Sequence, residues 1–353
     1  MTKQTKIGIA AIAGLVILAA VLSSLGPPMQ QQSGLQLSIP DMNQTSGLPV
    51  LSQSMPQFQG ISRWWNTPDG QPLTPEKLKG KVVLIDFWTY SCINCLRTLP
   101  FLRSLQTKYA DKGLVIVGVH TPEFDFEGKA ENVDKEIKKL GLLYPIALDA
   151  EHATWLAYNN RYWPAEYLFD AQGRLRHTHF GEGAYDETEN DIRQLLLEGT
   201  TFSLPPADTG FATPDFSEIG TSETYFGLKR QESFQGSPRP SAKKQAFVMV
   251  KQPNSNDWSV GGTWSFTDEY ALAEAADDTF SFNVKAAKLH LVLDSADGTD
   301  KRIRISVDGA VTQTMTINES TLYTVAEFAD GGRHTVTIEM LDAGVRFYSA
   351  TFS

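Results

Sequence analysis

The feature that most constrains the fold of this chain is its only pair of cysteines, Cys92 and Cys95, which follow the apolar run 82–85. Such a run predicts a buried strand, and residues three apart lie one turn from each other on a helix. The N–H groups at a helix N-terminus stabilise a thiolate. We therefore expect a redox centre in which Cys92 attacks a disulfide and Cys95 resolves the mixed disulfide.

Composition limits the functions that this pair can serve. The chain has 353 residues, a formal net charge of −10 and no cluster of Lys and Arg, which excludes nucleic-acid binding because that requires a concentrated basic surface. Two cysteines cannot form a disulfide scaffold, although a single structural bridge between them is the alternative to a redox centre. Zinc needs four ligands, and neither a second CxxC nor a nearby His pair is present. We expect no metal and no other cofactor.

The pattern of the N-terminal residues predicts an export signal. Lys3 and Lys6 precede the apolar stretch 7–22, a layout that is typical of a signal peptide or a transmembrane anchor over residues 1–26. Because no clear Ala-x-Ala cleavage site follows, we favour an anchor in the inner membrane over residues 7–25 and leave cleavage open. Both alternatives predict an exported protein, periplasmic or extracytoplasmic.

The rest of the chain divides by composition into four segments. Residues 27–59 are rich in Gln, Ser and Pro, which is typical of a flexible linker. Residues 60–200 alternate predicted strands and helices, which indicates an α/β domain. Residues 201–235 form a Pro- and Gly-rich connector, and residues 236–353 carry short strands with Asp-Gly and Gly-Gly turns. This last pattern predicts an all-β sandwich of jelly-roll type.

Hydrophobic periodicity predicts the individual elements of both domains. In the α/β domain we expect strands at 81–87, 114–119 and 144–148, a hairpin of 165–169 with 174–180, and helices at 92–109 with an interruption at Pro100, 129–140, 153–159 and 186–197. In the β domain we expect strands at 246–250, 264–266, 279–284, 288–293, 303–307, 311–317, 322–328 and 334–341.

Asp86 interrupts the apolar strand that leads to the cysteines. A buried carboxylate without a partner is costly, so the carboxyl group is expected to be neutralised through a raised pKa. Because a raised pKa makes the ionised carboxyl group a stronger base, that form of Asp86 could accept the proton of the second thiol. The alternative is that Asp86 only makes local hydrogen bonds.

Several motifs around the cysteines resemble the thioredoxin fold. Asp-Phe-Trp at 86–88 precedes Cys-Ile-Asn-Cys at 92–95, Pro100 follows, and Trp163-Pro164 stands before a predicted strand. By this resemblance Pro164 is the cis-proline that lies against the disulfide, and Trp163 offers backbone atoms to a substrate chain. An ordinary loop proline is the alternative for Pro164.

Longer motifs at 88–100, 118–124 and 160–165 resemble the DipZ-like branch of the TlpA/ResA group over residues 60–200. The resemblance implies a thiol–disulfide oxidoreductase, with reduction favoured, that acts on disulfide-bearing protein substrates. The segment 221–227 and the β-rich tail resemble the carbohydrate-binding-like module of that branch. DipZ proteins commonly begin with a multi-span electron-transporting domain. This chain has one apolar segment there, so it would take electrons from a separate membrane donor of the CcdA/DsbD type or act without one.

The resemblance also suggests a substrate-binding set of Trp88, Trp163 and Glu123. Glu123 follows the second strand and is expected near the active site, although a solvated loop carboxylate is the alternative. In the β domain three aromatic residues could stack on a glycan or could fill the core, namely Trp258, Trp264 and Tyr270.

Two other functions remain open from the sequence. Thr89-x-x-Cys92 resembles half of a peroxidatic motif, which suggests a thiol peroxidase, but Ile85 stands where the proline of that motif is expected. The second alternative is a surface module that binds carbohydrate or protein and carries the dithiol as an accessory.

Overall fold

The computed structural model describes residues 47–353 except 200–202, 209 and 212–215, and these described residues form one compact unit. The predicted signal or anchor, over residues 1–26, lies outside the described part of the chain. No helix among the described residues is long and apolar enough to cross a membrane.

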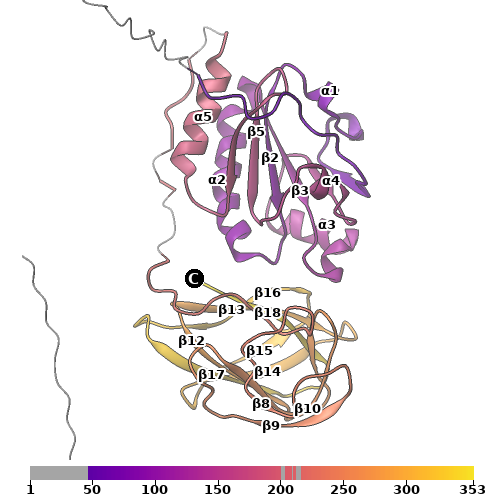
Figure 1. The fold of residues 1–353 in the computed structure, drawn as a ribbon, viewed down its shortest axis with the longest axis vertical. Helices are drawn as coiled ribbons and strands as arrows, with labels where there is room; N and C mark the ends of the chain where they lie inside the picture. Colours follow the sequence, from indigo (N-terminus) through magenta and orange to yellow (C-terminus); the bar gives the residue numbers. More distant parts are fainter. Residues whose placement is uncertain (1–46, 200–202, 209, 212–215) are drawn as a thin grey trace, which may run out of the picture. The chain divides into compact units, whose positions relative to one another are not determined.

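A six-stranded sheet forms the centre of the α/β domain, with the strand order β1-β4-β3-β2-β5-β6 (Figure 1). Strands β2, β3 and β4 are parallel, whereas β1, β5 and β6 are antiparallel to their neighbours. The strands are β1 Arg63–Trp65, β2 Val82–Trp88, β3 Leu114–His120, β4 Ile146–Leu148, β5 Ala165–Phe169 and β6 Leu175–Phe180. The predicted strands and the closing hairpin are confirmed.

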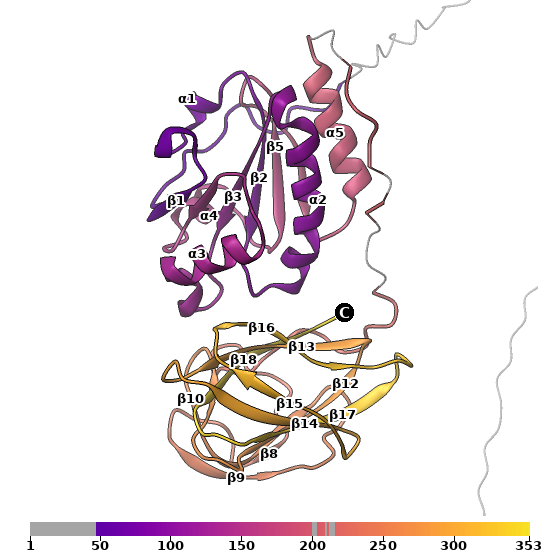
Figure 2. The same cartoon turned by 180° about the vertical axis from the view of Figure 1, so that it is seen from behind.

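Helices cover both faces of this sheet. Alternate residues of β2 divide between the faces, so that Leu84 packs with α2, α3 and α5 while Ile85 packs with α1 and α4. Figure 2 shows α2 and α5 side by side over the sheet. The helices are α1 Pro75–Leu78, α2 Ile93–Tyr109, α3 Ala130–Lys139, α4 Ala153–Ala157 and α5 Tyr185–Leu197. The helices shield both faces of the sheet from solvent, which accounts for the continuous apolar runs in β2 and β3.

Helix α2 differs from its prediction at Pro100. The helix continues through this residue instead of breaking there. Pro100 is exposed, while Leu99 and Phe101 on either side are buried. The apolar contacts of the flanking residues hold the helix together although proline removes one backbone donor.

The second domain is entirely β and its strands join in one large curled sheet. The strands are β7 Thr224–Tyr225, β8 Gly236–Ser237, β9 Gln245–Met249, β10 Trp258–Phe266, β11 Ala271–Ala273, β12 Thr279–Lys285, β13 Lys288–Ser295, β14 Lys301–Val307, β15 Ala310–Ile317, β16 Thr321–Glu327, β17 Arg333–Met340 and β18 Val345–Phe352. The sequence did not predict β18, which pairs with β7, β11 and β13.

Two of the aromatic residues considered for glycan stacking lie in the core of the β domain. Trp258 and Trp264 are fully buried, and their indole N–H groups donate to the carbonyl oxygens of Glu232 and Gly261. The third, Tyr270, lies under the guanidinium of Arg346, 5.2 Å from ring centroid to Cζ. The structure therefore favours the alternative in which Trp258 and Trp264 fill the core.

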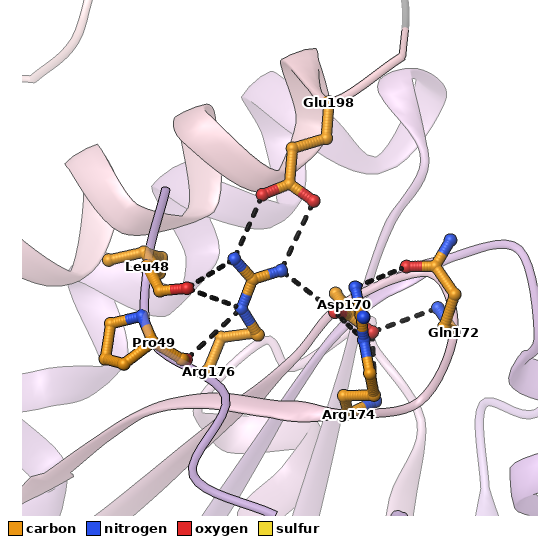
Figure 3. A network of polar contacts seen from close by, with 7 residues as sticks. All are labelled: Leu48, Pro49, Asp170, Gln172, Arg174, Arg176 and Glu198. Carbon is orange, nitrogen blue, oxygen red and sulfur yellow. Dashed lines mark hydrogen bonds and ion pairs between the residues drawn. The ribbon is translucent and has the colours of Figure 1, made fainter. Parts of the chain in front are cut away.

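A buried arginine ties the start of the described chain to the α/β domain (Figure 3). Arg176 in β6 donates to the Leu48 carbonyl at 2.6 Å, to Asp170 at 2.9 Å and to Glu198 at 3.1 Å. Burial opposes ionisation of Asp170, but hydrogen bonds from the Arg174 backbone and from Arg176 hold its pKa below the usual value. This part of the predicted linker is therefore ordered against the sheet.

Candidate active site

The two cysteines occupy different environments at the start of α2. Cys92 is the N-cap residue with an extended backbone, and its sulfur accepts a hydrogen bond from the Cys95 N–H at 3.4 Å. Cys92 is partly exposed, whereas Cys95, one turn inside, is 1% exposed. Both carry free thiols. The strand-to-helix junction therefore presents one sulfur to solvent and shields the other.

Asp86 lies in the middle of β2 and is 1% exposed. The alternation along β2 places it on the face of the sheet that α2 and Cys95 cover. Neither carboxyl oxygen has a hydrogen-bond partner among the described residues. Burial, and then the charge of Glu166, raise the pKa of Asp86 well above its usual value, as the sequence predicted.

Glu166 is a second buried carboxyl group that sequence reasoning missed. It pairs directly with Asp86 across β2 and β5, so the two side chains share a face. Burial raises the pKa of Glu166 to about 7, and the Thr188 hydroxyl donates to its carboxyl group at 3.2 Å. The signal was available, since Glu166 interrupts the buried strand 165–169 as Asp86 interrupts β2.

Burial also governs the second thiol. It raises the pKa of Cys95 well above its usual value, and the neighbouring Cys92 and Asp86 raise it further. A thiol in this setting remains protonated unless a nearby group takes its proton. Asp86 is the carboxyl group whose charge acts on Cys95, and in its ionised form it can accept a proton.

The loop before β5 faces the exposed sulfur. The peptide bond between Trp163 and Pro164 is cis, and the Trp163 carbonyl oxygen lies 4.0 Å from Cys92 Sγ. The Trp163 indole N–H donates to the Thr121 carbonyl at 3.0 Å, and its ring packs at a tilt of 36° against Trp155, with centroids 4.1 Å apart. The structure thus brings Pro164 and Trp163 beside Cys92.

Trp88 is placed differently from the rest of the predicted substrate-binding set. Its side chain is fully buried, edge-on to His120 with ring centroids 5.0 Å apart. A Cβ on the neighbouring Gly118 would lie 2.9 Å from the Trp88 indole nitrogen, so the close packing requires glycine there. A role of Trp88 in substrate binding would therefore have to act through the residues that it packs against.

A buried carboxylate fixes the turn that carries Cys92. Glu127 is fully buried and accepts a hydrogen bond from the Ser91 hydroxyl at 2.5 Å. It also accepts from the backbone N–H groups of Glu123 and Phe124 at 2.6 and 3.0 Å. The sequence did not single out Glu127, because its partner Ser91 is 36 residues away. Burial, and then the charge of Glu123, raise the pKa of Glu127 to about 7.

Replacing Glu127 with glutamine should make stability less dependent on pH. The pKa of Glu127 is higher in the folded state than in the unfolded state, so the folded state binds more protons. Its contribution to the free energy of unfolding therefore falls as pH rises from about 4.5 through about 7. Glutamine carries no charge, so relative to the unsubstituted protein the variant should gain about 2 kcal/mol between pH 5 and pH 8. Urea unfolding at both pH values measures this gain. The exposed Glu131→Gln variant is the matched control. The expectation would be contradicted if the difference in unfolding free energy between Glu127→Gln and the unsubstituted protein did not change with pH.

Glu123 lies at the edge of the site. Its carboxylate accepts hydrogen bonds from the Tyr225 hydroxyl at 2.8 Å and from Arg230 at 2.7 Å. Together with Cys92 and Trp163 it lines a cavity of ≈ 260 Å³. Proximity to Cys92 agrees with the expectation for Glu123, although the carboxylate is held by the β domain rather than solvated.

The described residues contain no group of three or more His, Cys, Asp or Glu side chains placed to hold a metal ion. Thr89, which suggested a peroxidatic motif, is fully buried, and its hydroxyl lies 3.4 Å from His120 Nε2. Burial lowers the pKa of His120 to about 3, so this imidazole is neutral at physiological pH.

Comparisons with known proteins match both halves of the chain. The family model described as Redoxin matches residues 51–196, and the one described as Thioredoxin like C-terminal domain matches residues 221–353. Protein DipZ of Mycobacterium bovis is 41% identical over 240 residues, which are 67% of this chain and 34% of that protein. The chain thus spans about a third of the length of DipZ.

Shorter relatives match the α/β domain. Thiol-disulfide oxidoreductase YkuV of Bacillus subtilis is 34% identical over 149 residues, which are 42% of this chain and 97% of that protein. A thioredoxin-like protein solved in solution in its oxidized form shares 32% sequence identity and covers 42% of this chain and 97% of its own, with a TM-score of 0.38.

Proposed function

This chain belongs to the thioredoxin-like thiol–disulfide oxidoreductases, and we propose that it acts as an exported reductase of protein disulfides through Cys92 and Cys95. The observation that carries this proposal is the contrast between the two thiols: Cys92 is partly exposed at a helix N-terminus, and Cys95 is buried over Asp86. An exposed thiolate and a shielded partner are what a two-step exchange requires.

In the first step the Cys92 thiolate attacks one sulfur of the substrate disulfide. A mixed disulfide forms, and the other substrate sulfur leaves as a thiolate that takes a proton from solvent. In the second step Asp86 accepts the Cys95 proton, and the Cys95 sulfur attacks Cys92. The Cys92–Cys95 disulfide forms, the substrate leaves fully reduced, and the enzyme has given up two electrons.

The Trp163 carbonyl and Pro164 flank this reaction. Proline has no N–H group, so the edge of the loop beside Cys92 is open to an extended substrate chain. We propose that Trp163 and Pro164 align the substrate segment along Cys92, as a strand added to the edge of the loop.

A turnover needs a source of electrons, which we propose is a membrane donor of the CcdA/DsbD type. Export is inferred from Lys3, Lys6 and the apolar stretch that follows, with residues 7–25 as the proposed anchor. The proposed domain limits are 60–200 and 236–353. For the β domain we propose a jelly-roll sandwich that binds a glycan.

The peroxidase alternative is not favoured. The curated relative that matches the α/β domain over nearly its whole length is named a thiol-disulfide oxidoreductase, and the Thr89 hydroxyl faces His120 rather than the exposed sulfur. A surface-binding role with an accessory dithiol has no specific observation in its favour.

A redox titration tests the proposed direction. The protein comprising residues 47–353 is equilibrated with glutathione buffers. The fraction that holds the Cys92–Cys95 disulfide is then measured by thiol labelling and mass spectrometry. A reductase predicts a potential near about −270 mV, whereas a value near about −120 mV would indicate an oxidant and contradict the proposal.

A further inference from the structure

The cavity beside Cys92 has walls from both domains. On one side are Cys92 and the loop before β5, and on the other is the segment Glu223–Arg230 of the β domain. Its volume of ≈ 260 Å³ is below the range of about 300–1,000 Å³ that encloses a drug-sized ligand. Such a space suits a short extended stretch of a partner chain rather than a folded surface.

The cation of the wall from the β domain is already paired. Arg230 pairs with Glu123 at 2.7 Å, and the two side chains are 38% and 11% exposed. The guanidinium of Arg230 also lies 3.6 Å from the Tyr225 ring centroid, while the Tyr225 hydroxyl donates to Glu123. Because these three groups satisfy one another, Arg230 has little free charge to offer a ligand.

Arg161 differs from Arg230, the other cation that lines the cavity. It is exposed, lies two residues before Trp163, and its guanidinium has no hydrogen bond or ion pair within the part of the chain that the structure describes. A guanidinium presents a planar fork of donors that matches a carboxylate. The cavity therefore holds a reactive sulfur and an unpaired cation.

We infer that this cavity selects a substrate cysteine that lies in an extended segment next to an acidic residue. Arg161 pairs with the substrate carboxylate, and Glu223–Arg230 forms the opposite wall. The inference rests on the proposed function and adds to it a class of substrate. It also gives the β domain a part in substrate choice, through a wall that the α/β domain alone lacks.

The test compares disulfide-linked peptides that differ only in the residue beside the cysteine, which is Asp, Asn or Lys. Single-turnover reduction by the full reduced chain is measured by release of a fluorescent reporter. The Asp peptide should react about two- to fivefold faster than the Asn peptide, the size of one partly exposed charge pair. The Lys peptide should be slower than both.

Charge-removing variants locate this preference. Arg161→Gln should bring the ratio of Asp to Asn rates to about one, while Arg239→Gln, an equal change at an exposed arginine outside the cavity, should preserve it. Burial, and then the charge of Glu123, raise the pKa of Glu223 to about 7. At pH 8, where this carboxyl group is ionised, Glu223→Gln removes a negative charge from the opposite wall and should raise the ratio above that of the unsubstituted protein.

The outcomes separate this inference from the proposed function. If the unsubstituted protein shows no preference, or if Arg161→Gln keeps it, the inference is wrong, provided that hydroxyethyl disulfide is still reduced. If the unsubstituted protein reduces neither the peptides nor hydroxyethyl disulfide, the proposed reductase function itself is wrong.

Discussion

Replacing Asp86 with asparagine should slow the release of substrate from Cys92 by about 100-fold at pH 7, the lower end of what a positioned general base contributes. The Cys95 thiol is buried and its pKa is raised, so it needs a local acceptor to become a nucleophile. Asparagine keeps the size of the side chain but cannot accept this proton. The deficit should shrink as pH rises, because hydroxide then removes the proton directly.

The measurement follows release of the second substrate thiol in a single turnover, in stopped flow, between pH 6 and pH 9. Glu166→Gln is the matched control, since it neutralises the cross-strand carboxyl group and leaves Asp86 in place. The Glu166→Gln variant should slow release of the substrate thiol much less than Asp86→Asn does. It should also shift the pH dependence of the release rate to lower pH, because the Glu166 charge no longer raises the pKa of Asp86. A rate for Asp86→Asn equal to that of the unsubstituted protein would contradict the role proposed for Asp86.

The second large effect concerns chemical reactivity of the reduced protein. Iodoacetamide at pH 7 should modify Cys92 at least about 100-fold faster than Cys95, because only Cys92 combines exposure with a helix N-terminus. The structure supports this through the 1% exposure of Cys95 and the burial that raises its pKa. Peptide mapping after timed quenching gives both rates.

Two variants complete this measurement. Cys92→Ser should be almost unreactive while folded and should react fully at Cys95 after unfolding in urea. Cys95→Ser should keep rapid labelling at Cys92. Faster labelling of Cys95 in the folded protein would reverse the roles that we assign to the two thiols.

The sequence predicted the features that depend on neighbours along the chain. An apolar strand that runs into two cysteines one turn apart predicts β2 and the start of α2. Asp86 was detectable because a single acid in a buried strand stands out against its neighbours. Alternating strands and helices also predicted β3, β4 and the hairpin of β5 with β6.

The missing parts of the site depend on contacts between residues that are distant in the sequence. Glu127 reaches Ser91 only because η3, residues Asp125–Gly128, folds back under the cysteine turn. Arg230 and Tyr225 reach Glu123 from more than 100 residues away, at separations of 107 and 102. No local pattern carries that information, so these partners were not predicted.

Strand β18 was missed for a different physical reason. A half-buried strand alternates apolar and polar residues, but Phe347, Tyr348, Ser349 and Ala350 are all buried in succession. Pairing with β11 and β13 and packing on both faces remove the alternation that reveals a strand.

The most direct test of the central claim, that Cys92 attacks and Cys95 resolves, is intact-mass analysis of Cys95→Ser after mixing with a disulfide-bearing peptide. We expect one stable adduct of a single half-peptide, mapped to Cys92 and released by dithiothreitol, and no adduct with Cys92→Ser under the same conditions. Failure of Cys95→Ser to accumulate any adduct, or an adduct of equal yield on the Cys92→Ser protein, would contradict the account.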